Sequence, residues 1–130
     1  MGAGCPKNQL LLLLVVLATL GSPPTSLGAT KPSLVFVTKS DACACTANLC
    51  VAGEQAVLNF LETTGDRIRY ERVDLARDAG AGKTYQVVTL PVVLLLDAAG
   101  EAIGRFDSYV TEEQLAEVWK QHLSALGVQP

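Results

Sequence analysis

The sequence predicts an α/β domain in which a β-α-β unit is followed by a β-β-α unit, giving a mixed sheet with helices on both faces. Three observations lead to this prediction. Two short apolar runs, residues 33–38 and 92–96, are rich in β-branched residues and typical of buried strands. Two longer segments, 47–64 and 111–126, repeat apolar residues at helical spacing. A tight turn at 97–100 indicates that the last two strands are antiparallel.

Composition supports one folded domain. The chain has 130 residues, of which 49% are apolar and 18% charged, so it is too apolar for a disordered protein. The net charge is −3, and the basic residues are scattered singly rather than gathered in a run. Nucleic-acid binders usually show a basic patch, so we expect no nucleic-acid partner.

Residues 1–28 have the three-part pattern of a secretory signal peptide. Lys7 and the amino terminus provide the positive part, residues 10–20 provide the apolar part, and small residues with helix breakers follow. A membrane anchor is the alternative interpretation. A spanning helix needs about 20 apolar residues, and Pro23 and Pro24 end this run earlier. We therefore expect export, with no membrane contact beyond the signal peptide.

Cleavage is expected after Gly28, or one residue later after Ala29, because small residues precede both positions. The mature domain would then comprise residues 29–130 and would be extracytoplasmic, either periplasmic or secreted. Cys5 would leave with the signal peptide.

The first half of the mature domain is predicted as strand, loop, helix and strand. Residues 33–38 form the first strand, and the polar loop 38–46 holds two cysteines. The helix 47–64 follows, and its end is marked by a Gly-Asp pair. The second strand, 68–75, loses its alternation at residues 71–72, so we expect one face to be partly wet. The predicted apolar stripe of the helix consists of Leu49, Ala52, Gly53, Ala56, Val57, Phe60 and Leu61.

The second half is predicted to contain a short helix, two strands and a closing helix. Residues 76–85 are small and polar, which suits a short helix or turn. The strands 92–96 and 101–106 follow. Thr111 begins the last helix and, with Gln114, has the spacing of a capping box. Its predicted apolar stripe consists of Leu115, Val118, Trp119, His122, Leu123 and Leu126.

The mature domain keeps three closely spaced cysteines, Cys43, Cys45 and Cys50. The thiolate is the reactive form, and a helix N-terminus lowers the pKa of a nearby thiol. Two residues five apart on a regular helix have Cα atoms about 8.7 Å apart, too far for a disulfide. If the helix begins at or after Thr46, all three sulfurs can gather instead. Asp41 and Thr46 are both acceptable N-caps, so both arrangements stay open.

The order of these elements resembles the thioredoxin-like superfamily. The strand, the cysteine loop and the long helix are similar to the active-site region of that family. Residues 83–96 are similar to the stretch that leads through the family's cis-proline strand, and the turn and closing helix also match. The resemblance covers residues 31–127. It implies a thioredoxin-like fold, a cis Leu90–Pro91 bond, and a substrate-docking loop at Leu90 and Pro91. It also implies that Cys43 is the attacking thiol.

Two departures from the family concern its chemistry. The family's Trp-Cys-Gly-Pro-Cys is replaced by Ala-Cys-Ala-Cys at residues 42–45, so the spacer has one residue instead of two. The buried acid of many family members would fall near Phe36 or Val37, and neither side chain can transfer a proton. The resemblance therefore supports the fold more directly than the activity.

Three functions follow from the cysteines. In the first, a thiol–disulfide oxidoreductase acts on protein or small-molecule thiols, with Cys43 attacking and Cys45 or Cys50 resolving. In the second, the three thiolates bind a soft metal such as Cu or Zn. In the third, a thioredoxin-like binding domain uses the cysteines for a structural disulfide. We expect a monomer without a cofactor, and a reactivity order of Cys43, Cys45, Cys50.

Overall fold

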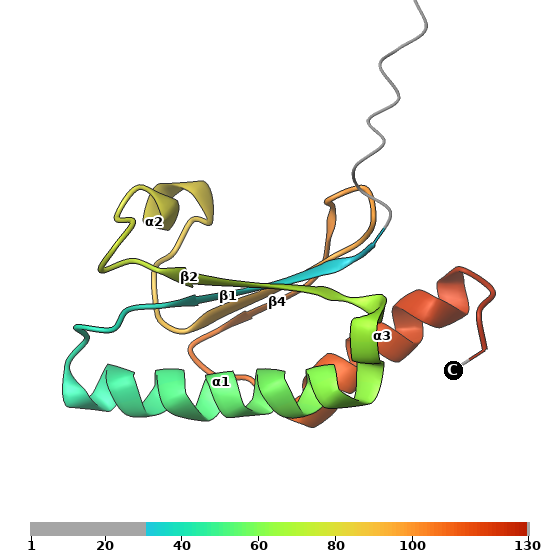
Figure 1. The fold of residues 1–130 in the computed structure, drawn as a ribbon, viewed down its shortest axis with the longest axis horizontal. Helices are drawn as coiled ribbons and strands as arrows, with labels where there is room; N and C mark the ends of the chain where they lie inside the picture. The colour runs from blue at the N-terminus through green and yellow to red at the C-terminus, as the bar shows by residue number, and fades with distance from the viewer. Residues whose placement is uncertain (1–30, 130) are drawn as a thin grey trace, which may run out of the picture.

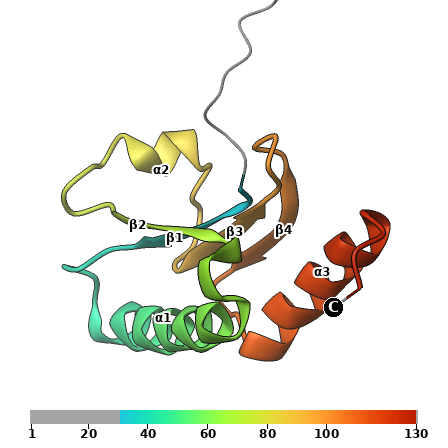
Figure 2. The same ribbon diagram turned by 45° about the vertical axis from the view of Figure 1, so that its right-hand side comes forward.

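The computed structural model describes residues 31–129, which form a mixed four-stranded sheet between helices. Two helices lie on one face of the sheet, and a short helix with its connecting segments lies on the other (Figures 1 and 2). The expectations for residues 1–28 lie outside the described part. The strands are β1 (Ser33–Thr38), β2 (Arg69–Asp74), β3 (Val92–Leu96) and β4 (Ala102–Asp107), and the helices are α1 (Ala44–Thr64), α2 (Ala81–Thr84) and α3 (Glu112–Ala125).

The sheet has the order β2-β1-β3-β4. β1 is parallel to β2 and antiparallel to β3, and β3 is antiparallel to β4. The predicted β-α-β and β-β-α units are therefore confirmed. β1 and β3 are central and almost wholly buried, whereas β2 is an edge strand with several exposed residues. This explains why β1 and β3 are continuous apolar runs while β2 mixes polar and apolar residues.

The long helix α1 begins earlier than the sequence predicts. Its first turn is closed by a hydrogen bond from the Ala47 N–H to the Cys43 carbonyl, with N and O 2.8 Å apart. Cys43 is the N-cap, so neither Asp41 nor Thr46 has that role, and the expected start at residue 47 is wrong. Ala44 has high helix propensity, which lets the helix extend into the small residues of the expected loop.

The core-facing stripe of α1 differs from the prediction by one position at its first turns. Leu49 is 41% exposed, whereas Cys50 is only 5% exposed and begins the buried face. The buried residues of α1 are Cys50, Gly53, Val57, Phe60 and Thr64. Because Cys50, Gly53 and Val57 follow helical spacing, Cys50 takes the core position expected for Leu49.

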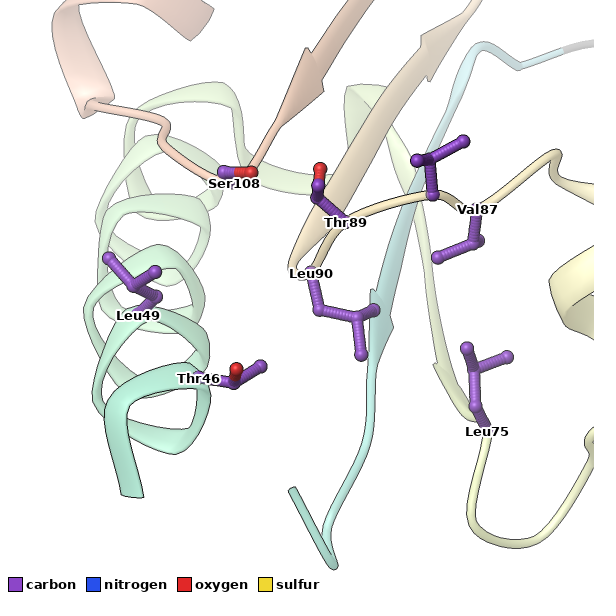
Figure 3. A pocket seen from close by; sticks show the side chains of 8 residues that line it. Thr46, Leu49, Leu75, Val87, Thr89, Leu90 and Ser108 are labelled. Carbon is purple, nitrogen blue, oxygen red and sulfur yellow. The ribbon is translucent and has the colours of Figure 1, made fainter. Parts of the chain in front are cut away.

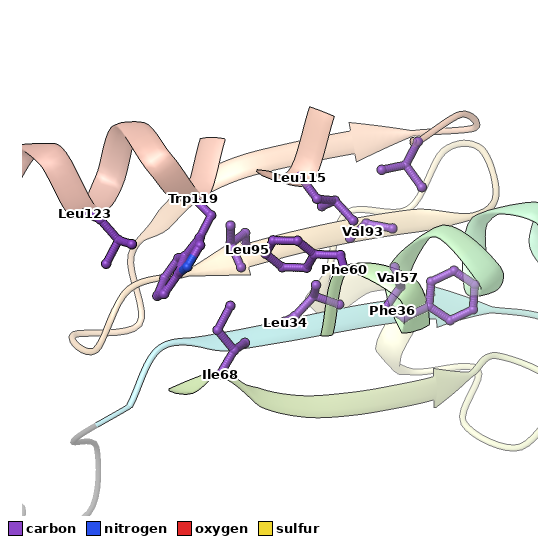
Figure 4. Close-up of a cluster of buried hydrophobic side chains, with 11 residues drawn as sticks. Leu34, Phe36, Val57, Phe60, Ile68, Val93, Leu95, Leu115, Trp119 and Leu123 are labelled. Carbon is purple, nitrogen blue, oxygen red and sulfur yellow. The ribbon is translucent and has the colours of Figure 1, made fainter. Parts of the chain in front are cut away.

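The main core lies between the sheet and the helices α1 and α3. Figure 4 shows Phe36 and Leu34 of β1 and Leu95 of β3 facing side chains of both helices. The capping box of α3 is confirmed: the Gln114 N–H donates to Thr111 Oγ1 at 3.2 Å, and the Thr111 N–H donates to Gln114 Oε1 at 2.9 Å. Leu126 lies just past the helix end and is exposed, contrary to its place in the predicted stripe. No helix within residues 31–129 is long and apolar enough to cross a membrane.

Gly53 allows α1 to approach the sheet closely. A Cβ at this position would lie 3.0 Å from Cγ of Pro91 and 3.5 Å from the Phe36 ring. We expect Gly53→Val to lower the free energy of unfolding by about 1–3 kcal/mol, since overpacking a core has this effect. Urea unfolding measures the change. Ala52→Val is the matched control, because Ala52 is exposed on the same helix. An equal loss in both variants would contradict the packing argument.

Candidate functional site

Cys43 lies where the loop after β1 meets the N-terminus of α1. Its side chain is exposed, and its backbone is extended, as expected of an N-cap residue. Its Sγ lies 3.4 Å from Oγ1 of Thr46, one helical turn further on. The first turn of α1 therefore places a hydroxyl group beside the exposed sulfur.

The first turn lowers the pKa of Cys43 below its ordinary value of 9.0. The hydrogen bond with the Thr46 side chain is the largest cause, and the backbone N–H of Thr46 is the second. Lys39, the nearest cation in the sequence, is 3.6 Å from the Asp41 carboxylate, which offsets its charge.

The other two cysteines do not gather around Cys43. Cys45 is exposed in the first turn of α1, and Cys50 is buried. Both are helical, so their Cα separation is too large for a disulfide. The three-sulfur arrangement needed a helix start at or after Thr46, and α1 begins before that residue. Within residues 31–129, no three His, Cys, Asp or Glu side chains come close enough to hold a metal ion.

We expect Thr46→Val to shift the alkylation of Cys43 to higher pH. The hydroxyl favours the thiolate, so the pH of half-maximal labelling should lie below 9.0 in the native protein and move toward 9.0 in the variant. Competitive alkylation read by peptide mass measures this shift, and it should label Cys43 first, then Cys45, then Cys50. Labelling of Cys50 before Cys43, or an unchanged pH profile in the variant, would contradict the assignment.

An open groove of about 550 Å³ lies beside this helix turn. Figure 3 shows Thr46 and Leu49 of α1 on one side, with Leu90 and Thr89 of the segment before β3 facing them. The lining residues are Thr46, Leu49, Leu75, Val87, Val88, Thr89, Leu90 and Ser108. Thr46 both lines the groove and contacts the Cys43 sulfur, so the thiol lies at the edge of a groove that mixes apolar and hydroxyl side chains.

The predicted cis Leu90–Pro91 bond is confirmed. Pro91 is fully buried, and its carbonyl accepts a hydrogen bond from the Ser108 N–H at 2.8 Å. Leu90 is half-buried and borders the groove. Within the described part of the chain, the main chain of Leu90 forms no backbone hydrogen bond. The structure thus anchors Pro91 and leaves the residue before it with unused backbone donors and acceptors.

Asp74, at the end of β2, supports the loop that carries Cys43. Its carboxylate accepts hydrogen bonds from the N–H of Ser40 at 3.0 Å and of Ala76 at 3.1 Å. Arg72 lies 3.9 Å from the same side chain, which is only 8% exposed. Sequence reasoning missed Asp74, because its partner Ser40 lies 34 residues away in the chain.

We expect Asp74→Asn to lower the melting temperature at neutral pH and to have little effect in acid. The hydrogen bonds from Ser40, and more weakly the hydrogen bond from Ala76 and the positive charge of Arg72, hold the pKa of Asp74 below its ordinary value of 3.8. A lowered folded-state pKa means that the carboxylate stabilises the fold above pH 3.8 and that this is lost as the pH falls further. Melting curves of both proteins from pH 7 to pH 2, through the range below pH 3.8, measure the difference. A difference that grew toward low pH would contradict this role.

Arg105 of β4 holds the segment that leads to Leu90. Its Nη1 donates to the Tyr85 carbonyl at 2.9 Å and its Nη2 to the Gln86 carbonyl at 3.1 Å. The same guanidinium forms two hydrogen bonds with Asp107, at 3.0 and 2.9 Å. Gln86 has a positive φ of 52°, which is uncommon for a residue with a side chain. No sequence motif indicated this contact.

Solved structures similar to the domain include several thioredoxins. A thioredoxin-2 described as a component of malaria parasite protein secretion machinery is 19% identical, with a TM-score of 0.61, and the match covers 71% of this chain and 84% of that one. Thioredoxin 1 from the thermophilic eubacterium Thermosipho africanus is 18% identical, with a TM-score of 0.59 and coverages of 73% and 98%. The chain has a thioredoxin-like fold. Chloroplastic thioredoxin z, at 15% identity, gives a TM-score of 0.59 and coverages of 70% and 77%.

The sequence matches no protein-family model and no curated protein. At the identities of the solved structures, the likeness concerns the fold. In this thioredoxin-like domain, the first strand has Phe36 and Val37 fully buried, without an acid below the cysteine loop. The activity therefore has to be argued from Cys43 and its surroundings.

Proposed function

We propose that this protein is an extracytoplasmic thiol–disulfide exchange protein whose attacking group is Cys43. Its substrates are protein or small-molecule thiols and disulfides, and Cys45 is the second accessible thiol. The proposed docking surface is the groove beside Leu90 and Pro91. Export rests on the signal-peptide pattern of residues 1–28, which also predicts an oxidising compartment.

One observation carries this proposal: an exposed cysteine caps a 21-residue helix beside a hydroxyl that favours its thiolate. Reactive cysteines occupy such positions because unpaired N–H groups and the helix dipole stabilise the negative sulfur. A buried structural cysteine lacks both access and thiolate stabilisation. Cys50 is buried in this way, and Cys43 is not.

The groove supplies a second argument. Leu49 is 41% exposed and Val88 is 91% exposed, so apolar surface lies open near the thiol. The unused backbone groups of Leu90 could pair with an extended substrate segment, as in β-strand addition. An unfolded or disulfide-linked peptide could contact the exposed apolar side chains and also pair with the backbone of Leu90.

The metal-binding alternative needs three sulfurs close together. Cys50 is two helical turns from Cys43 and is buried, so this arrangement is not formed. The binding-domain alternative differs from the proposal in one measurable property, catalysed exchange. The three cysteines are all free in the structure.

The test measures the rate of thiol–disulfide exchange between a disulfide-linked peptide and reduced glutathione near neutral pH, with samples quenched in acid at timed intervals. The proposal expects the reduced mature protein to accelerate exchange above the protein-free rate. It expects Cys50→Ala to retain this acceleration, because Cys50 is buried. Absence of any acceleration by a folded protein with titratable Cys43 would favour the binding-domain alternative.

A further inference from the structure

Within residues 31–129, the contact of the Cys43 sulfur is with the Thr46 hydroxyl and not with a second thiol. Cys43 is the N-cap of α1, and the side chain of an N-cap residue turns toward the backbone of the first helical turn. The neighbour of Cys43 at three residues is Thr46, and the contact is made at 3.4 Å. Cys45 is two residues away, and Cys50 is seven residues away, about 10 Å along the helix axis.

Thr46 takes the position of the resolving cysteine in the Cys-x-x-Cys pattern that the sequence resembles. Counting three residues from Cys43 reaches Thr46, and the structure places its hydroxyl against the sulfur. A hydroxyl can form a hydrogen bond with a thiolate, but it is not a nucleophile for disulfides at neutral pH. A sulfur-bound group on Cys43 therefore meets no thiol at this position.

Cys45 lies in the first turn of α1 and forms no disulfide with Cys43. The Cys43 sulfur contacts the Thr46 hydroxyl, and a disulfide needs two Cβ atoms that point toward each other. A Cys-x-Cys disulfide closes a small, strained ring, and we expect it to distort this turn, which the 2.8 Å hydrogen bond from the Ala47 N–H to the Cys43 carbonyl closes. Intramolecular resolution is thus opposed by the helix itself.

We infer that Cys43 works as a single exchanging thiol, which holds a mixed disulfide until a second, external thiol releases it. This inference rests on the proposed function. In the first step the Cys43 thiolate attacks an external disulfide R–S–S–R′, forms Cys43–S–S–R, and releases R′–S⁻. In the second step an external thiolate attacks the mixed disulfide, forms a disulfide with R, and returns Cys43 as a thiolate. Both steps exchange sulfurs without any net oxidant.

The test uses the reduced mature protein with oxidised glutathione as the probe, followed by acid quenching at timed intervals and intact mass measurement. We expect one glutathione on Cys43, formed and retained equally in the native protein and in Cys45→Ser. In Thr46→Cys the new thiol lies where the Thr46 hydroxyl contacts the Cys43 sulfur, so resolution becomes intramolecular and the adduct should disappear on the order of 10-fold or more faster than in the native protein. A disulfide-linked peptide in place of oxidised glutathione shows whether a protein or a small-molecule thiol is preferred.

The inference is overturned if the native protein releases glutathione and ends two hydrogens lighter than its reduced form while Cys45→Ser keeps the adduct. That result would show that Cys45 displaces glutathione and forms a disulfide with Cys43. This comparison does not depend on the folding of Thr46→Cys. Cys50→Ala serves as a control and should behave like the native protein. Failure of Cys43 to form any adduct would reject the proposed function itself, which is a different result from rapid internal resolution.

Discussion

Replacing Cys43 with serine should reduce the rate of thiol–disulfide exchange to that of a protein-free solution. A serine hydroxyl keeps the N-cap role but cannot provide a thiolate. The fold should therefore survive, and the melting temperature should change little. The exchange assay with the disulfide-linked peptide measures the loss, and circular dichroism confirms the fold.

Two matched variants separate Cys43 from the other thiols. Cys45→Ser should retain at least most of the activity, because the Cys43 sulfur contacts the Thr46 hydroxyl and not a second thiol. Cys50→Ala should also remain active, although it removes a side chain that is only 5% exposed and so lowers stability. If Cys43→Ser stayed active while Cys45→Ser did not, the attacking thiol would be Cys45.

The strands and the closing helix could be predicted because their signals are local. β1 and β3 are buried on both faces, which requires continuous apolar runs such as 92–96. The capping box of Thr111 and Gln114 is a contact between residues three apart, so its spacing appears directly in the sequence. The cis bond before Pro91 followed from resemblance to a family.

The start of α1 was not determined by local signals. Ala44, Cys45 and Thr46 suit either a polar loop or a first helical turn, and the structure selects the helix with Cys43 as its cap. This helix start decides how the three thiols lie relative to one another. It places Cys50 in the core and the Thr46 hydroxyl beside Cys43. Propensity alone differs by only fractions of a kcal/mol per residue for such side chains.

The supports of the site depend on long-range contacts. Asp74 contacts the backbone of Ser40, 34 residues away, and Arg105 contacts Tyr85, 20 residues away. In the sequence both residues are ordinary charged residues of half-exposed strands. Their roles exist only once β2 and β4 are placed beside the cysteine loop and the segment before β3.

Arg105→Ala should lower the free energy of unfolding by about 2 kcal/mol and weaken peptide binding more than catalysis. The substitution removes hydrogen bonds from a charged donor to the carbonyls of Tyr85 and Gln86, and such bonds contribute about 1.5–3 kcal/mol. It also frees a segment whose residue Gln86 has a positive φ, so the groove wall at Val87 and Leu90 should become mobile.

Arg105→Lys is the informative partner of this variant. A lysine keeps the charge opposite Asp107 but has no planar fork to reach two carbonyls at once. If the fork holds the segment, the lysine variant should lose stability nearly as the alanine variant does, and both should raise KM for the disulfide-linked peptide. KM for oxidised glutathione should stay unchanged, because a small disulfide needs only the exposed Cys43. Full rescue by lysine would instead assign the effect to the ion pair with Asp107.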